Sequence, residues 1–97
     1  MRMALPSFLQ PYLASYDLKK MGRQRDKKII ITEILNKGDD TAIKWLGKNY
    51  TQEEIRAVVA SPIRGMWLSE ILTYWLKIFG LKLPEDVFKK AVINLTP

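Results

Sequence analysis

The sequence predicts an all-α fold, a compact array of about five short helices in a single domain. Apolar residues recur at helical spacing along most of the chain, and glycine, proline and capping residues separate these stretches. Nowhere do apolar and polar residues alternate over five or more positions, as they do in a half-buried strand. We expect one domain over residues 1–97, with an N-terminal arm at 1–24 and a helical core at 25–95.

The N-terminal arm is expected to form short helical turns only. Pro11 interrupts the segment 7–13, and Asp17 can cap a single turn over residues 18–21. The first long helix is then predicted over residues 25–37, with Ile29 off its buried face and Gly38 as a left-handed terminator. The residues predicted on the buried face are Ile30, Ile31, Ile34 and Leu35.

Two capped helices are expected next. Asp39 or Asp40 caps a helix over residues 41–48, and Thr51 with Glu54 forms a capping box for a helix that stops before Pro62. The predicted buried residues are Ala42, Trp45 and Leu46 in the first of these helices, and Ile55, Val58 and Val59 in the second.

The most hydrophobic helix is predicted over residues 66–79, with Gly80 as its terminator, and a last helix follows Pro84. The predicted core residues of the former are Leu68, Ile71, Leu72, Trp75 and Phe79. Those of the latter are Val87, Phe88, Ala91, Val92 and Leu95.

The composition excludes several kinds of chemistry. The chain has no cysteine and no histidine, so it lacks thiolate ligands, cysteine nucleophiles and the usual general base near neutral pH. The acidic pairs at 39–40, 53–54 and 85–86 stand at predicted helix starts, which favours capping over metal binding or acid–base work. We expect no enzyme activity, no cofactor and no metal site, and a cytoplasmic location. The longest apolar-rich stretch, residues 66–79, is shorter than the roughly 20 residues that a membrane span needs.

Positive charge is concentrated in one segment. The formal net charge is +6, and residues 19–28 hold six cations against the single anion Asp26. This basic run could bind an anion or nucleic acid, or it could be an ordinary solvated surface. The candidate anion-binding residues are Lys19, Lys20, Arg23, Arg25, Lys27 and Lys28.

The helix expected at 66–79 has an apolar face wider than one core contact requires. Trp67 and Tyr74 lie together at one edge of that face, beside Glu70, and are candidate anchors for a protein partner. Ile29 is a third candidate, because it lies off the core face of its helix. The alternative is that helix 66–79 is the central helix of the domain, covered on several sides.

Residues 41–61 have the outline of a helix-turn-helix unit. Glu53 and Glu54, however, stand at the start of the second helix, the end that meets base edges in such proteins, where acid repels phosphate.

From about residue 16 to residue 80 the chain resembles a little-characterised family of small bacterial and archaeal proteins. The residues that carry the resemblance are Tyr16-Asp17, Ile34-Leu35-Asn36-Lys37-Gly38-Asp39, Trp45-Leu46 with Tyr50, Ile55-Arg56-Ala57-Val58-Val59, Ser61 with Arg64-Gly65, and Tyr74-Trp75. Similar proteins are often encoded beside a nucleotidyltransferase-like toxin of the abortive-infection type, so the resemblance implies an antitoxin or accessory partner. It transfers no functional residues.

The sequence thus supports a protein-binding module, with a cognate toxin as the expected partner. Its alternatives are a nucleic-acid-binding protein or autorepressor that uses the basic run, and a small ribonuclease-type toxin. A homo-oligomer is left open.

Overall fold

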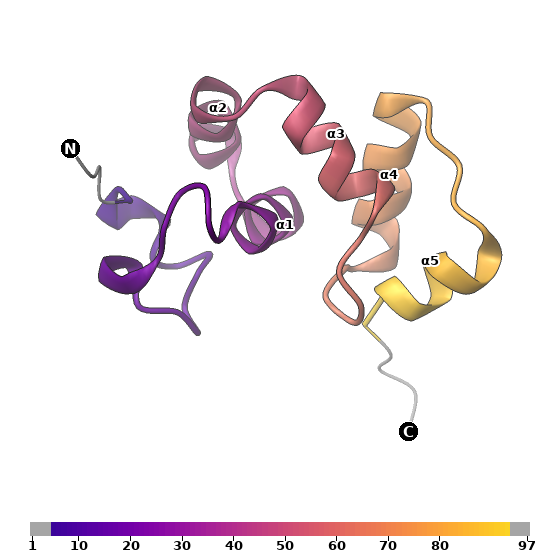
Figure 1. Cartoon of the computed structure of the whole chain (residues 1–97), viewed down its shortest axis with the longest axis horizontal. Helices are drawn as coiled ribbons and strands as arrows, with labels where there is room; N and C mark the ends of the chain where they lie inside the picture. Colours follow the sequence, from indigo (N-terminus) through magenta and orange to yellow (C-terminus); the bar gives the residue numbers. More distant parts are fainter. Residues whose placement is uncertain (1–4, 94–97) are drawn as a thin grey trace.

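The computed structural model describes residues 5–93, which form five α-helices and two short 3-10 turns without a named strand (Figure 1). The prediction of an all-α fold is therefore confirmed. The elements are η1 (Ser7–Leu9), η2 (Leu18–Lys20), α1 (Lys27–Lys37), α2 (Asp40–Asn49), α3 (Gln52–Ala60), α4 (Ser69–Phe79) and α5 (Glu85–Ala91).

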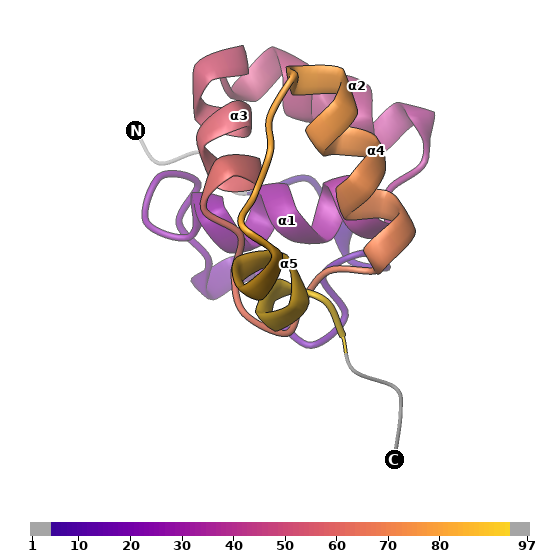
Figure 2. The same ribbon diagram turned by 90° about the vertical axis from the view of Figure 1, so that its right-hand side faces the viewer.

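The centre of the fold is α1, which packs against α2, α3 and α4, while α3 also packs against α4. Figure 2 shows α1 crossing the middle of the molecule with α3, α4 and α5 around it. Every residue from Ile30 to Asn36 is buried. The alternative that the helix at 66–79 is the central one is therefore wrong. Apolar spacing does not reveal the central place of α1, because its buried residues include the hydrogen-bonded polar residues Thr32, Glu33 and Asn36.

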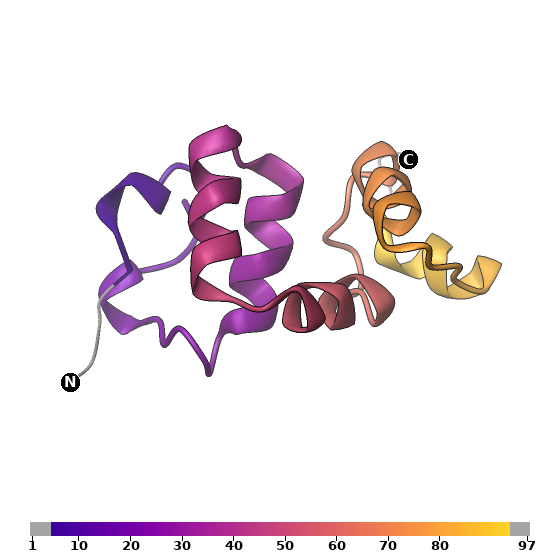
Figure 3. The same ribbon diagram turned by 90° about the horizontal axis from the view of Figure 1, so that it is seen from above.

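The N-terminal segment contributes to the same core. Leu5, Leu9, Leu13 and Leu18 are buried, Leu9 and Leu13 completely. In Figure 3 this segment lies beside the α1–α2 pair, at the far side from α4 and α5. Its two 3-10 turns place one leucine each in the interior.

The predicted helix starts of α2 and α3 are confirmed. The Asp39 carboxylate accepts a hydrogen bond of 3.0 Å from the Ala42 N–H. Thr51 and Glu54 form the reciprocal capping box, with distances of 3.0 and 2.9 Å. All the residues predicted to be buried in these two helices are buried, except Trp45, which is half-buried.

Gly38 ends α1, but not in the left-handed conformation that its position predicted. Its φ is −73°, in the extended region. A Cβ at this position would lie 2.6 Å from the Ile34 carbonyl oxygen and 3.1 Å from the Ala42 Cβ. Glycine is therefore needed because a Cβ would clash with the last turn of α1 and crowd α2, and not for a positive φ.

The helix predicted over residues 66–79 begins only at Ser69, so its first turn was predicted wrongly. Trp67 is extended and pairs with the end of α5, since its N–H donates to the Ala91 carbonyl (3.0 Å) and its carbonyl accepts from the Ile93 N–H (2.7 Å). Leu68, a predicted core residue, is 42% exposed as a result. The predicted terminator Gly80 is confirmed, with a φ of 63°.

The last helix follows Pro84 as predicted. Ala91 is buried, whereas Val87, Phe88 and Val92 are half-buried. Leu95 lies outside the described residues. Within residues 5–93, no helix has both the length and the apolar character needed to cross a membrane.

Candidate functional site

An apolar ridge on the outer face of α4 is the main exposed hydrophobic feature of this helix. Tyr74 and Ile78, one helical turn apart, are 55% and 56% exposed. Tyr74 meets the edge of the Trp75 ring at a centroid distance of 5.1 Å, and Trp75 stacks on Phe79 at 6.1 Å. We call Tyr74 and Ile78 the α4 ridge. The ridge exposes two large side chains next to the rings of Trp75 and Phe79, which are held in place by packing.

A groove of about 240 Å³ lies next to the ridge, between α2, the start of α3 and α4. We call it the α4 groove. Ile43 and Gly47 of α2 line one wall, and Trp75, Ile78 and Phe79 line the other. The polar groups of its lining are few, and the Trp75 indole N–H already donates to the Leu35 carbonyl at 3.4 Å. Such a surface suits an apolar partner side chain better than a charged ligand.

The structure separates the three residues predicted to bind a protein partner. Tyr74 is exposed on α4, as an anchor must be. Trp67 is completely buried, so its assignment as an anchor is wrong. The reason is that Val92, from the far end of the chain, pairs with Trp67, and a helical projection of residues 66–79 cannot show this. Ile29 is half-buried in the first turn of α1 and does not line the α4 groove.

Ile78 was not singled out by the sequence reasoning. It follows Tyr74 by four residues, which places both on one face of a helix. This spacing was the available signal, but the predicted start at residue 66 directed attention to Trp67 instead.

The basic run extends from η2 through a loop to the first turn of α1, and half of its cations are already engaged. The Arg23 guanidinium donates to the Asn49 side chain at 3.1 Å, Arg25 pairs with Asp26 at 3.0 Å, and Lys27 pairs with Glu54 at 3.3 Å. The side chains of Lys19, Lys20 and Lys28 are exposed and form no ion pair within residues 5–93. The six cations therefore do not form one continuous free patch.

Tyr50 anchors this loop to the end of α2. Its hydroxyl donates to the Arg23 carbonyl at 2.8 Å, and its ring meets the Trp45 ring edge-on at 6.1 Å. Burial raises the pKa of Tyr50 to about 12. The loop conformation thus depends on a neutral, buried tyrosine.

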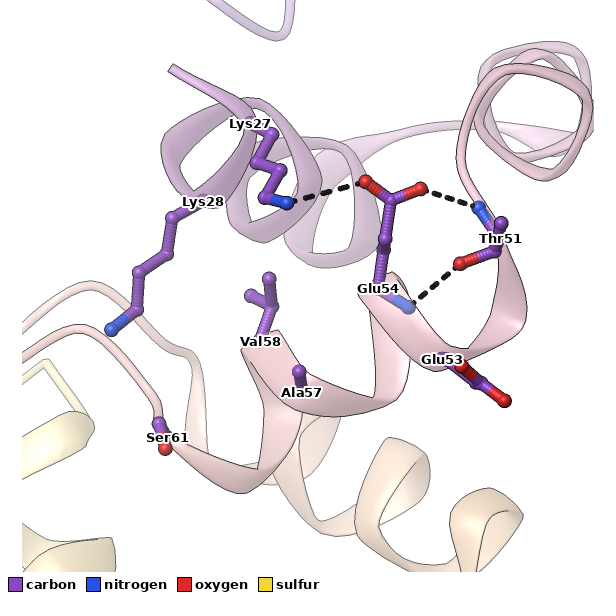
Figure 4. A pocket seen from close by; sticks show the side chains of 8 residues that line it. All are labelled: Lys27, Lys28, Thr51, Glu53, Glu54, Ala57, Val58 and Ser61. Carbon is purple, nitrogen blue, oxygen red and sulfur yellow. Dashed lines mark hydrogen bonds and ion pairs between the residues drawn. The ribbon is translucent and has the colours of Figure 1, made fainter. Parts of the chain in front are cut away.

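An open pocket of about 480 Å³ lies between the first turn of α1 and α3 (Figure 4). Its lysines do not converge, since Lys27 reaches Glu54 and Lys28 extends toward the end where Ser61 lies. The Thr51 N–H and then Lys27 hold the pKa of Glu54 below its ordinary value. Glu53 also lines the pocket. The pocket therefore carries both positive and negative charges and is not a dedicated anion site.

Asp39 and Glu54 act as capping residues at the starts of α2 and α3, whereas α5 has no side-chain cap and its Glu85 pairs with Lys89. The hydrogen bond from the Ala42 N–H lowers the pKa of Asp39, as expected for a capping carboxylate. Among residues 5–93 no group of three histidine, cysteine, aspartate or glutamate side chains could hold a metal ion.

One comparison with known proteins gives a match. The sequence pattern of a family of unknown function, DUF6922, matches residues 10–59, about half of the chain. This region runs from the end of η1 to α3, so α4 and its ridge lie outside it. No curated protein and no solved structure matches. The chain therefore belongs to the DUF6922 family of unknown function.

Proposed function

We propose that this chain is a non-catalytic protein-binding module, the antitoxin or accessory partner of a nucleotidyltransferase-like toxin. The observation that carries the proposal is the α4 ridge, where Tyr74 and Ile78 are more than half exposed beside an apolar groove. The resemblance described above is what suggests a toxin as the partner. The absence of histidine and cysteine from the sequence favours contact over catalysis.

The ridge has the properties of an interface anchor. Tyrosine is enriched among residues that dominate binding energy, and a fully buried isoleucine gains about 1.5–3 kcal/mol relative to an exposed one. The side chains beneath the ridge are packed already, because Trp75 stacks on Phe79 and donates to α1. Binding there would therefore order few additional side chains.

The alternative of nucleic-acid binding through residues 19–28 has less support. Arg23, Arg25 and Lys27 already have partners in the folded chain, and they would have to leave them or share them with phosphates. Glu53 also stands exposed at the start of α3, where it repels phosphate.

The proposal is tested by co-expressing the chain with the product of the neighbouring gene, which we expect to be the toxin, and separating the products by size-exclusion chromatography. We expect one co-eluting peak. The variant Ile78→Asp should weaken the complex by at least tenfold, because it places a charge in an apolar contact. Two separate peaks for the wild-type pair would contradict the proposal.

The matched control is Leu68→Asp. Leu68 is also an exposed apolar residue, at 42%, but it precedes α4 and lies outside the ridge and the groove. We expect this variant to bind the toxin as the wild type does. Equal losses for both variants would mean that the ridge is not the contact surface. Thermal unfolding of each variant alone checks that both are folded.

A further inference from the structure

A further cavity, of about 270 Å³, lies between the η1 turn and the outer face of α2. Its lining consists of the aromatic residues Phe8 and Trp45, the lysines Lys44 and Lys48, and Thr41. We propose that this cavity binds single-stranded nucleic acid, with one base held at the two aromatic rings and the neighbouring phosphates at the two lysines.

The aromatic part of the site is available to a ligand. The side chain of Phe8 is 42% exposed, whereas that of the next residue, Leu9, is completely buried. Trp45 meets Tyr50 edge-on, and the rings of Phe8 and Trp45 form no pair with each other in the described structure. Both rings line the cavity, and flat aromatic surfaces are where unpaired bases stack.

The lysines of the site are free as well. Lys44 and Lys48 are one turn apart on α2, both are exposed, and neither has an ion pair or a side-chain hydrogen bond within residues 5–93. No acidic residue lines the cavity. A backbone that carries one negative charge per nucleotide can place neighbouring phosphates at these two lysines.

Chain topology creates this combination of residues. The basic run at 19–28 has no aromatic side chain, so this run itself offers no ring on which a base could stack. The fold instead brings Phe8 next to Lys44 and Lys48, which lie far along the chain. Aromatic residues and cations from two separate elements then surround one cavity.

The geometry favours single strands over other ligands. In a duplex the bases are stacked on each other and cannot enter a lateral cavity without unpairing. An acidic peptide would use the lysines but would leave the aromatic rings without a partner. The site is also separate from the α4 groove, because Ile43 and Gly47 line that groove and point about 100° away from Lys44 and Lys48 around α2.

The test is fluorescence anisotropy with three labelled probes, a ten-nucleotide oligo-U RNA, a ten-nucleotide oligo-dT and a DNA duplex of equal length. We expect the purified chain to bind at least one of the single strands more tightly than the duplex. Phe8→Ala should weaken that binding between about fivefold and a hundredfold, and Phe8→Trp should preserve it. Duplex binding equal to that of both single strands, or no binding to either strand, would overturn the proposal.

The lysines are tested by the double variant Lys44→Gln/Lys48→Gln. Removing two phosphate contacts should make the slope of log K against log salt less negative by about 1.4. The matched control is Lys77→Gln/Lys82→Gln, which removes the same charge from exposed positions outside the cavity. An equal change of slope in the control, unchanged affinity in Phe8→Ala, or equally tight binding of a poly-glutamate peptide would overturn the proposed site. Thermal unfolding verifies that each variant is folded.

Discussion

The two ends of segment 66–79 have opposite roles, although the spacing of their aromatic residues is that of one helix face. Trp67 is completely buried in an extended stretch, and Tyr74, seven residues later, is 55% exposed on α4. In a continuous helix the two side chains would lie at the same edge. The comparison shows that periodicity assigns faces only within an element, and that the element boundary here is set by distant residues.

Asn36 is the distant residue that fixes this boundary from the side of α1. Its amide donates to the Met66 carbonyl and its oxygen accepts from the Leu68 N–H, both at 3.0 Å. These bonds hold residues 66–68 extended, while Ala91 and Ile93 bind the backbone of Trp67 on its other side. Backbone groups that a helix would have satisfied internally are thus satisfied by tertiary contacts.

The largest expected effect is that of Trp67→Ala. Removing a completely buried tryptophan should lower the free energy of unfolding by about 3–5 kcal/mol, measured by urea denaturation. Trp67→Phe should cost less, because it also removes an indole N–H that has no hydrogen-bond partner within the described residues. A loss below about 1 kcal/mol for Trp67→Ala would contradict the contrast between the two ends of the segment.

The next effect is that of Asn36→Ala, which removes both hydrogen bonds to residues 66 and 68. Leaving buried backbone groups without partners should cost about 1–3 kcal/mol. Because the Leu68 N–H then loses its acceptor, its hydrogen exchange should accelerate more than that of amides in the middle of α4. Unchanged protection of the Leu68 amide would show that Asn36 does not define the start of α4.

Features that depend on neighbouring residues were predictable from the sequence. The cap at Asp39, the capping box of Thr51 with Glu54 and the left-handed Gly80 were all predicted correctly, since each involves residues within a few positions. Features that depend on distant contacts were not. Gly38 is extended and leaves no room for a Cβ beside Ile34 and Ala42, and the pairing of Trp67 with Val92 shortens α4.

The candidate sites follow the same division. Tyr74 could be selected from the helical pattern of its own segment, and Ile78 was within reach of the same reasoning. The cavity between Phe8 and α2 could not be predicted from the sequence, because nothing in the local sequence relates η1 to Lys44. The ion pair of Lys27 with Glu54 could not be predicted either, because it joins residues far apart in the chain.

A further prediction extends the comparison to a buried tyrosine. Burial raises the pKa of Tyr50 from 10 to about 12, so the neutral form is favoured in the folded state. The stability from this shift is fully present below pH 10 and is lost as the pH rises through about 12. Urea denaturation of the wild type should show an alkaline loss of about 1–3 kcal/mol in this range beyond that of Tyr50→Phe.

At neutral pH the wild type should be more stable than Tyr50→Phe. Tyr50→Phe loses the hydrogen bond to the Arg23 carbonyl and should be less stable than the wild type by about 1 kcal/mol. The two unfolding free energies should therefore converge above pH 10. A constant difference from pH 7 to pH 12 would contradict the buried, neutral state of this hydroxyl.

The smallest expected effect on stability is that of Tyr74→Ala. The side chain is mostly in solvent and its packing in the folded chain includes the edge contact with Trp75, so the free energy of unfolding should change by about 0.5 kcal/mol or less. Alanine also has a higher helix propensity than tyrosine, which offsets part of the lost contact. If urea denaturation gave a loss of unfolding free energy comparable to that of Trp67→Ala, Tyr74 would belong to the core. The exposed residues of the α4 ridge would then stabilise the fold and would not be evidence of a binding surface. A small loss in the isolated chain together with a large loss of toxin binding is the combination expected of an interface residue.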